Sequence, residues 1–122
     1  MNVVDSSGWI EYFTGGKHAD TYAPAIEDTE NLLVPVICVY EIFKKLFQTQ
    51  SQTTAEVYMA DLMKGKVVDL TAPLAMSAAL ISIAHKLPMA DSIILAITRE
   101  NHATLWTQDE HFKGLENVQY IE

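Results

Sequence analysis

Four acidic residues lie at or next to junctions between strand-like and helix-like segments, and their type and spacing could do chemistry. They are Asp5, Glu41, Asp91 and Asp109. The first directly follows the β-branched run 1–4, the second lies in the helical pattern after the strand-like run 31–34, and the last follows the strand-like run 103–106. The third begins a helix that leads towards this last strand. Because ligands of an open parallel sheet bind beyond the carboxyl ends of its strands, we expect these carboxylates to share one edge.

Carboxylates crowded at one edge repel one another, and a hard divalent cation with oxygen ligands is the usual resolution. Few basic side chains are available instead, and only Lys44 and Lys45 are obviously close in the sequence to an acid of this set. The four acids therefore predict a site for Mg²⁺ or Mn²⁺. One bound ion lowers the pKa of a water to make a nucleophile, and a second would stabilise the leaving oxygen, which suits the hydrolysis of phosphate esters. Whether one or two ions bind stays open.

Three of the acids also have a purely structural interpretation in their own helices. Asp5 and Asp91 can act as helix caps, because the free N–H groups of a first turn accept a negative charge. Glu41 can be a surface residue that pairs with Lys44 and Lys45 one turn further along its helix. The sequence leaves both interpretations of each acid open.

The segment Thr107–Glu110 has the form of a capping box, in which Asp109 would be only an interior residue. The hydroxyls of Ser6 and Thr107 can either cap a helix or support an acidic ligand, and for Thr107 we expect the cap. The four histidines show no metal-ligand spacing, and His111 is the only one close to the acids.

The composition predicts one folded domain over residues 1–122, because 49% of the 122 residues are hydrophobic and 20% are charged. The single cysteine, Cys38, excludes an internal disulfide and a cysteine-based zinc site, and its apolar surroundings predict a buried, inert thiol. The N-terminus shows no basic segment followed by an apolar one, and the weakly polar run 72–84 is too short to span a bilayer. We therefore expect a cytoplasmic protein without membrane association.

The formal net charge of −8 limits how the protein can bind nucleic acid. A protein that coats nucleic acid non-specifically is normally basic, because its lysines and arginines displace counterions. This chain cannot bind in that way over its whole surface, but bound divalent ions would supply a local positive field. Lys44 and Lys45 are the candidates for contacting substrate phosphates, and a solvated helix face is the alternative for at least one of them.

Short strand-like runs alternate with helical patterns, which predicts an α/β fold with a central parallel sheet and helices on both faces. About five short strands are expected, at 1–4, 31–34, 66–70, 103–106 and 118–121. Two of the helices should be buried: one contains the stretch 93–97, which is apolar on every side, and the other covers 71–84, which is rich in Ala, Leu and Ile.

Four segments, in this order and spread over almost the whole chain, carry a resemblance to a known family. They are Val3-Val4-Asp5-Ser6-Ser7 followed by Trp9-Ile10, Glu41 after Val34-Pro35, Leu87-Pro88-Met89-Ala90-Asp91-Ser92-Ile93-Ile94-Leu95-Ala96, and Leu105-Trp106-Thr107-Gln108-Asp109-Glu110-His111-Phe112. They resemble the PIN-domain nucleases, and more narrowly the VapC toxins of prokaryotic toxin–antitoxin pairs. The segments around Asp91 and Asp109 are the most specific, and the match around Glu41 is the weakest.

The resemblance implies a PIN-like three-layer fold and a metal-dependent endoribonuclease whose acidic cluster is the set of four acids named above. It also implies homodimers, an RNA substrate and inhibition by a cognate antitoxin. Some relatives carry a further Asp at the position of His111, so a fifth acidic role is open here. The apolar stripe of Trp9, Tyr12 and Phe13 could form part of an antitoxin groove, or could equally be core packing.

Two functions of another class remain as alternatives. A receiver-like phosphoacceptor module suits the length, acidity and fold class, but it needs paired acids after the first strand, where Asp5 stands alone among serines. It also needs a lysine near the end of a late strand, and Lys113 has no such context. The second alternative is a catalytically silent PIN domain that only binds a partner. The intact set of four acids argues against it.

Overall fold

The computed structural model describes residues 1–122, and its centre is a sheet of five strands. The strands are β1 (Asn2–Val4), β2 (Leu32–Pro35), β3 (Lys66–Val68), β4 (Thr104–Thr107) and β5 (Val118–Tyr120). Their order across the sheet is β3-β2-β1-β4-β5, and every neighbouring pair is parallel. The predicted parallel sheet of about five short strands is confirmed.

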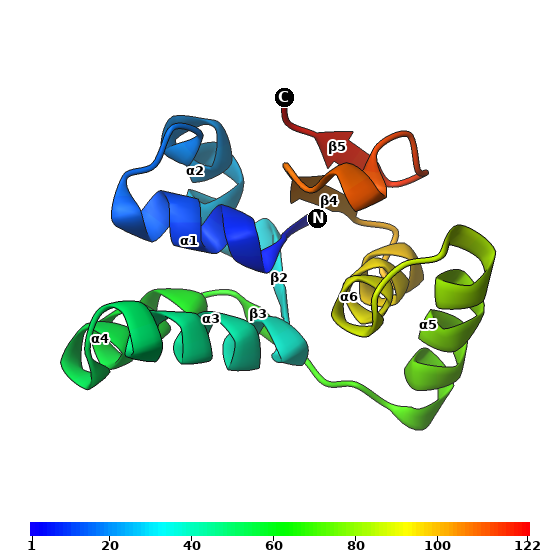
Figure 1. Cartoon of the computed structure of the whole chain (residues 1–122), viewed down its shortest axis with the longest axis horizontal. Coiled ribbons are helices and arrows are strands. Elements are labelled where there is room, and N and C mark those ends of the chain that lie inside the picture. The colour runs from blue at the N-terminus through cyan, green and yellow to red at the C-terminus, as the bar shows by residue number, and fades with distance from the viewer.

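Six α-helices cover the two faces of this sheet. They are α1 (Ser6–Thr14), α2 (Ala19–Glu27), α3 (Val36–Thr49), α4 (Gln52–Leu62), α5 (Ala72–His85) and α6 (Met89–Glu100). α1 to α4 lie to the left of the sheet in Figure 1, and α5 and α6 lie to its right. The chain moves one way along the sheet from β1 to β3 and then returns to β4, so right-handed crossovers place these two groups on opposite faces. The predicted three-layer α/β fold is confirmed.

The interior of the protein is built around β1, the middle strand. Val3 and Val4 have no exposed surface, and the same holds for Val34 of β2 and Leu105 of β4. α6 lies on the face of the sheet opposite α1 to α4, and every residue of this helix from Ser92 to Thr98 is buried. The expectation that this apolar stretch forms a buried helix is confirmed. The loop that follows β1 and the first turn of α6 therefore both adjoin the core.

The contact between α1 and β1 is close enough to require a glycine. A Cβ atom at Gly8 would lie 2.8 Å from Cγ1 of Val4 and 2.5 Å from Cε1 of Tyr22, closer than side chains can approach. α1 ends at Gly15, whose φ of 67° is the left-handed conformation that glycine adopts without strain. These two glycines fix where α1 lies on the sheet, and with it the residues at the start of the helix.

The aromatic stripe of α1 belongs mainly to the core. Trp9 is fully buried, and Phe13 stacks on Tyr58 of α4 with ring centroids 4.3 Å apart. The hydroxyl of Tyr12 donates a hydrogen bond to Glu27 of α2. Of the two interpretations of this stripe, the structure supports packing between α1, α2 and α4.

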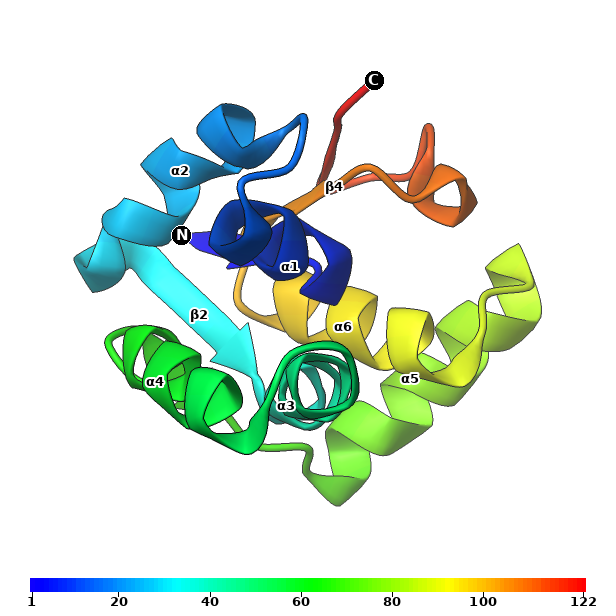
Figure 2. The same ribbon diagram turned by 60° about the vertical axis from the view of Figure 1, so that its left-hand side comes forward.

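The expectation that the helix over 71–84 is buried is wrong. Within α5 only Ala78 is buried, and the side chains of Met76, Leu80 and Ile83 are 65%, 70% and 77% exposed. The reason is the layering, since α6 already covers this face of the sheet and α5 packs on the outer side of α6 (Figure 2). Helix composition alone does not distinguish a helix in the first layer from one in a second layer.

No single helix is long and apolar enough to cross a membrane. α5 and α6 taken together have the length and apolar composition of a membrane span, but the two helices are bent by 115° relative to each other.

Candidate metal centre

Asp5 is the most deeply placed of the four acids, with 5% of its surface exposed. It is the N-cap of α1, because its Oδ1 accepts a hydrogen bond of 2.8 Å from the backbone N–H of Ser6. Its other oxygen, Oδ2, accepts from the hydroxyls of Thr107 at 2.8 Å and Ser7 at 3.3 Å. The cap interpretation is thus correct but incomplete, since the carboxylate also contacts the end of β4.

Burial raises the pKa of Asp5 from its ordinary value of 3.8 to about 6. The hydrogen bond from Thr107 lowers this pKa, while the negative charge of Asp91 raises it further. The protein therefore holds a carboxylate that is expensive to ionise, without a basic side chain beside it. A bound cation at this place would remove much of that cost.

Thr107 does not act as the expected helix cap. Its Oγ1 donates to Asp5 and accepts a hydrogen bond of 3.0 Å from the backbone N–H of Asp109. The short 3₁₀ turn Glu110–Phe112 is capped instead by Asp109, whose Oδ1 accepts from the N–H of His111 at 2.9 Å. The capping box predicted for Thr107–Glu110 is therefore wrong, and Thr107 joins two of the acids.

Glu41 does not pair with the lysines of its own helix. Its Oε1 accepts a hydrogen bond of 2.8 Å from the hydroxyl of Ser6, and no ion pair joins it to Lys44 or Lys45. Ser6 follows Asp5 directly, so this bond ties Glu41, in the second turn of α3, to the residues that follow β1. Of the two interpretations of Ser6, the structure supports a hydroxyl that holds an acidic side chain.

Asp91 does not cap α6 with its side chain. The N-cap position is Pro88, and Asp91 lies in the first turn with its Oδ2 3.2 Å from Nδ1 of His111. Burial and the negative charge of Asp109 raise the pKa of Asp91, although the contact with His111 lowers it. Because no hydrogen bond to a free backbone N–H holds this carboxylate, its placement towards the other acids has no purely helical explanation.

The structure brings all four acids together at the carboxyl edge of the sheet. Asp91 and Asp109 each raise the pKa of Asp5, and Asp109 and Glu41 each raise the pKa of Asp91, as charges at short range do. Within this cluster the tightest group is Asp91, Asp109 and His111, whose ligand atoms lie within 4.8 Å of one another. The donor set is rich in carboxylate oxygen, and it fits a hard divalent cation.

His111 is the member of the cluster that the sequence did not assign to it. Its Nδ1 lies 3.2 Å from Oδ2 of Asp91 and 3.2 Å from Oδ1 of Asp109. The signal was its position two residues after an acid of the set, but only the 3₁₀ turn brings its ring back over that acid. Ser7, which donates to Asp5, was also not foreseen.

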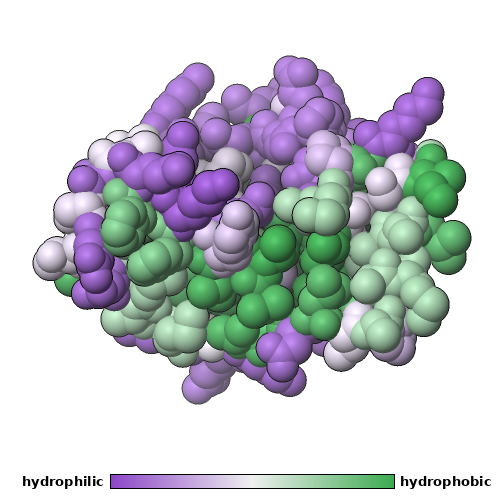
Figure 3. Space-filling model, turned by 60° about the horizontal axis from the view of Figure 1, so that its bottom comes forward, coloured by the Kyte–Doolittle hydropathy of each residue, from purple (hydrophilic) through white to green (hydrophobic).

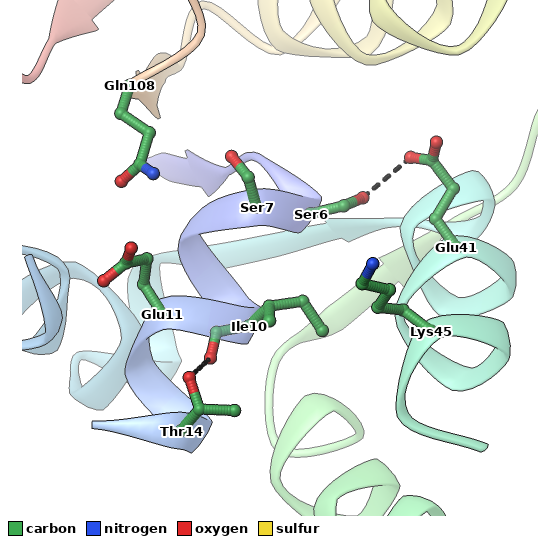
Figure 4. Close-up of a pocket in the computed structure, with 8 residues that line it drawn as sticks. All are labelled: Ser6, Ser7, Ile10, Glu11, Thr14, Glu41, Lys45 and Gln108. Carbon is green, nitrogen blue, oxygen red and sulfur yellow. Dashed lines mark hydrogen bonds between the residues drawn. The ribbon is translucent and has the colours of Figure 1, made fainter. Parts of the chain in front are cut away.

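A pocket of about 360 Å³ opens beside the acidic cluster, between α1 and α3 (Figure 4). Ser6, Ser7 and Glu41 line its end nearest the cluster, and the only basic side chain in its lining is Lys45. The other lining residues are Ile10, Glu11, Thr14 and Gln108. Lys44 points elsewhere, with its Nζ 5.7 Å from the centre of the Tyr40 ring. A chain of phosphates that reaches the cluster through this pocket passes Lys45 rather than Lys44.

A parallel sheet that gathers carboxylates at its carboxyl edge defines an α/β domain with an acidic cluster that is a candidate metal centre. A family model described as the PIN domain matches residues 3–117, and the chain belongs to the PIN-domain family. This family is one of nucleases. A search of curated proteins gives no match.

Solved structures with the same fold include toxin–antitoxin complexes and a toxin. A toxin–antitoxin complex from Klebsiella pneumoniae is 20% identical, with 99% of this chain and 100% of that chain covered and a TM-score of 0.82. VapC20 of Mycobacterium tuberculosis, described as a toxin that cleaves the sarcin–ricin loop, is 17% identical, with 95% of both chains covered and a TM-score of 0.79. VapBC2 of Rickettsia felis, bound to a DNA fragment from its promoter, is 10% identical, with 99% and 98% covered and a TM-score of 0.78.

Proposed function

We propose that this protein is a metal-dependent endoribonuclease and the toxin of a toxin–antitoxin pair. The observation that carries the proposal is the convergence of four carboxylates, with no lysine or arginine paired to any of them, at the edge of the sheet where ligands bind. Similarity to a toxin described as cleaving the sarcin–ricin loop, within a family of nucleases, makes RNA the substrate we propose. Since the substrate is cellular RNA, the protein would act in the cytoplasm.

Asp5, Asp91, Asp109 and Glu41 are the residues that would hold Mg²⁺ or Mn²⁺. When bound, such an ion lowers the pKa of a water that attacks phosphorus and stabilises charge on the phosphate oxygens. The surrounding hydroxyls orient the ligands: Thr107 fixes the carboxylate of Asp5, and Ser6 fixes that of Glu41. These hydrogen bonds hold oxygen atoms in place without adding positive charge, so they leave the carboxylates free to bind a cation.

Cleavage of total RNA by the purified protein tests this function. We expect cleavage with Mg²⁺ or Mn²⁺, none with EDTA, and restoration when the metal is returned in excess. Single-stranded and double-stranded DNA of matched length serve as controls for the choice of substrate. A folded, metal-loaded protein that cuts no RNA would favour the catalytically silent PIN domain.

Lys45 is the side chain we expect to contact substrate phosphates. Lys45→Ala should weaken RNA binding about threefold to tenfold at 100 mM salt and lower the slope of log affinity against log salt by about 1, as loss of one phosphate contact does. Lys44→Ala is the matched control, because it removes the same charge one residue away but outside the pocket. Filter binding at several salt concentrations measures both variants. Equal effects of the two substitutions would show that Lys45 acts only through the overall surface charge and does not contact a substrate phosphate.

Two protein partners belong to the proposal. Toxin–antitoxin complexes among the similar structures support a cognate antitoxin. A second copy of the chain fits the outer face of α5, which contains no Asp, Glu, Lys or Arg. Copies with a net charge of −8 repel each other least where they meet through an uncharged surface. Apolar atoms gather over this part of the molecule, on the right of Figure 3.

A further inference from the structure

The imidazole of His111 is placed against the acidic cluster as a third ligand group. Its Nδ1 lies 3.2 Å from an oxygen of Asp91 and 3.2 Å from an oxygen of Asp109. Adjacent ligands of an octahedral ion with bonds of about 2.1 Å lie about 3.0 Å apart. The two nitrogen-to-oxygen distances match such neighbouring corners. With all three ligand atoms within 4.8 Å of one another, they are close enough to bind one ion together.

We propose that His111 binds the metal through Nδ1 together with Asp91 and Asp109, which gives this site a preference for Mn²⁺ over Mg²⁺. The proposal rests on the proposed function, since it concerns the same ion. Mg²⁺ takes oxygen ligands and dehydrates reluctantly. An imidazole nitrogen instead favours first-row transition ions, so a His at this position selects among the dications.

The backbone around His111 holds the ring in this orientation before any ion binds. The N–H of His111 donates to Oδ1 of Asp109, and the 3₁₀ turn places the side chain back over the cluster. The residue that follows, Phe112, is fully buried and anchors the turn to the core. The side chain of His111 is 57% exposed, so a hydrated ion can reach the ring and the two carboxylates from solvent.

The other role open to this ring is that of a cation that neutralises the two acids. The two roles predict opposite effects of removing it. A ligand contributes to binding of the ion, so its loss weakens binding. A positive imidazole competes with the ion for Asp91 and Asp109, so its loss strengthens binding of every divalent ion.

Metal binding to the purified protein tests the proposal without a measurement of activity. Calorimetry gives the affinities for Mn²⁺ and Mg²⁺, and pulsed electron paramagnetic resonance of bound Mn²⁺ detects a directly coordinated nitrogen. Labelling the histidines with ¹⁵N identifies that nitrogen as imidazole. His111→Ala and His111→Asp are compared with His102→Asn, a control in which the exposed residue with a φ of 52° is replaced by one that tolerates this backbone conformation.

We expect the wild-type protein and the His102→Asn variant to show the nitrogen signal. His111→Ala should lose it and bind Mn²⁺ at least tenfold more weakly, with a smaller loss for Mg²⁺. His111→Asp should lose the nitrogen signal and shift the preference towards Mg²⁺. Tighter binding of both ions by His111→Ala, or an unchanged affinity, would overturn the proposal that His111 is a ligand and would leave the proposed function standing. Wild-type protein that binds neither ion would overturn the proposed function as well.

Discussion

Asp5→Asn should lower RNA cleavage at least about 100-fold and at the same time make the metal-free protein more stable at pH 7.5. Residues that only orient metal ligands cost about 10–100-fold when they are changed, so the loss of a ligand should reach or exceed the upper end of that range. The amide can still accept the hydrogen bond from the N–H of Ser6. The helix therefore keeps its cap, while the buried charge is removed.

The gain in stability follows from the raised pKa of Asp5. In the folded protein this pKa is about 6, against 3.8 for the unfolded chain, so the folded state binds more protons between these two values. Stability from this group is therefore highest below pH 3.8 and falls as the pH rises to about 6. A difference of about two pH units corresponds to at most about 3 kcal/mol. The asparagine variant has no such loss.

Urea denaturation in EDTA from pH 4 to pH 8, together with the RNA cleavage assay, measures both effects. The stability difference between the wild type and Asp5→Asn should be largest at pH 7 and above and should disappear near pH 4. Asp69→Asn is the matched control, because Asp69 follows β3 but is exposed and lies outside the acidic cluster. Full cleavage by Asp5→Asn would remove Asp5 from the site. A large loss of stability in Asp5→Asn would instead show that Asp5 acts mainly as the N-cap of α1.

Leu80→Glu should convert a dimer of the protein into monomers. The side chain of Leu80 is 70% exposed in the single chain, between Met76 and Ile83 on the outer face of α5. In a two-fold symmetric dimer each substitution occurs twice in the interface. Burial of one leucine side chain contributes about 1.5–3 kcal/mol. Loss of two such contributions, before any cost of burying the new carboxylates, weakens association about 100-fold or more.

Light scattering after size-exclusion chromatography, over a range of protein concentrations, measures this effect. Val57→Glu is the control, since Val57 on α4 is 63% exposed and the substitution is of the same kind on the other side of the sheet. We expect the control to remain dimeric with wild-type stability. Wild-type protein that is monomeric at every concentration, or a dimer that survives Leu80→Glu, would assign the face of α5 to another partner.

The fold could be predicted largely because its signals are local. β-branched runs and helical periodicity mark the strands and helices, and the position of an acid after a strand places it at the edge where ligands bind. For this reason Asp5 and Asp109 could be placed without coordinates. The exposure of α5 could not be predicted, because an apolar helix contacts the sheet only where no other helix already covers that face.

The finer structure of the site depends on contacts between residues that are distant in the sequence. The hydroxyl of Thr107 meets Asp5 across 102 positions of sequence, and that of Ser6 meets Glu41 across 35. Local rules instead favoured a cap for Thr107 and lysine partners for Glu41. The imidazole of His111 reaches Asp91 only because the short turn after β4 folds back towards α6. No periodic pattern in the sequence predicts that turn.

The pairing of β1 with β4 joins the beginning and the end of the chain at one place. Asp5 directly follows β1, while Thr107 ends β4 and lies 102 positions further along the chain. The centre is completed only when β4 docks beside β1, because this pairing brings Thr107 and Asp109 to Asp5. A local opening that separates β4 from β1 would therefore switch the proposed nuclease off without unfolding the helices.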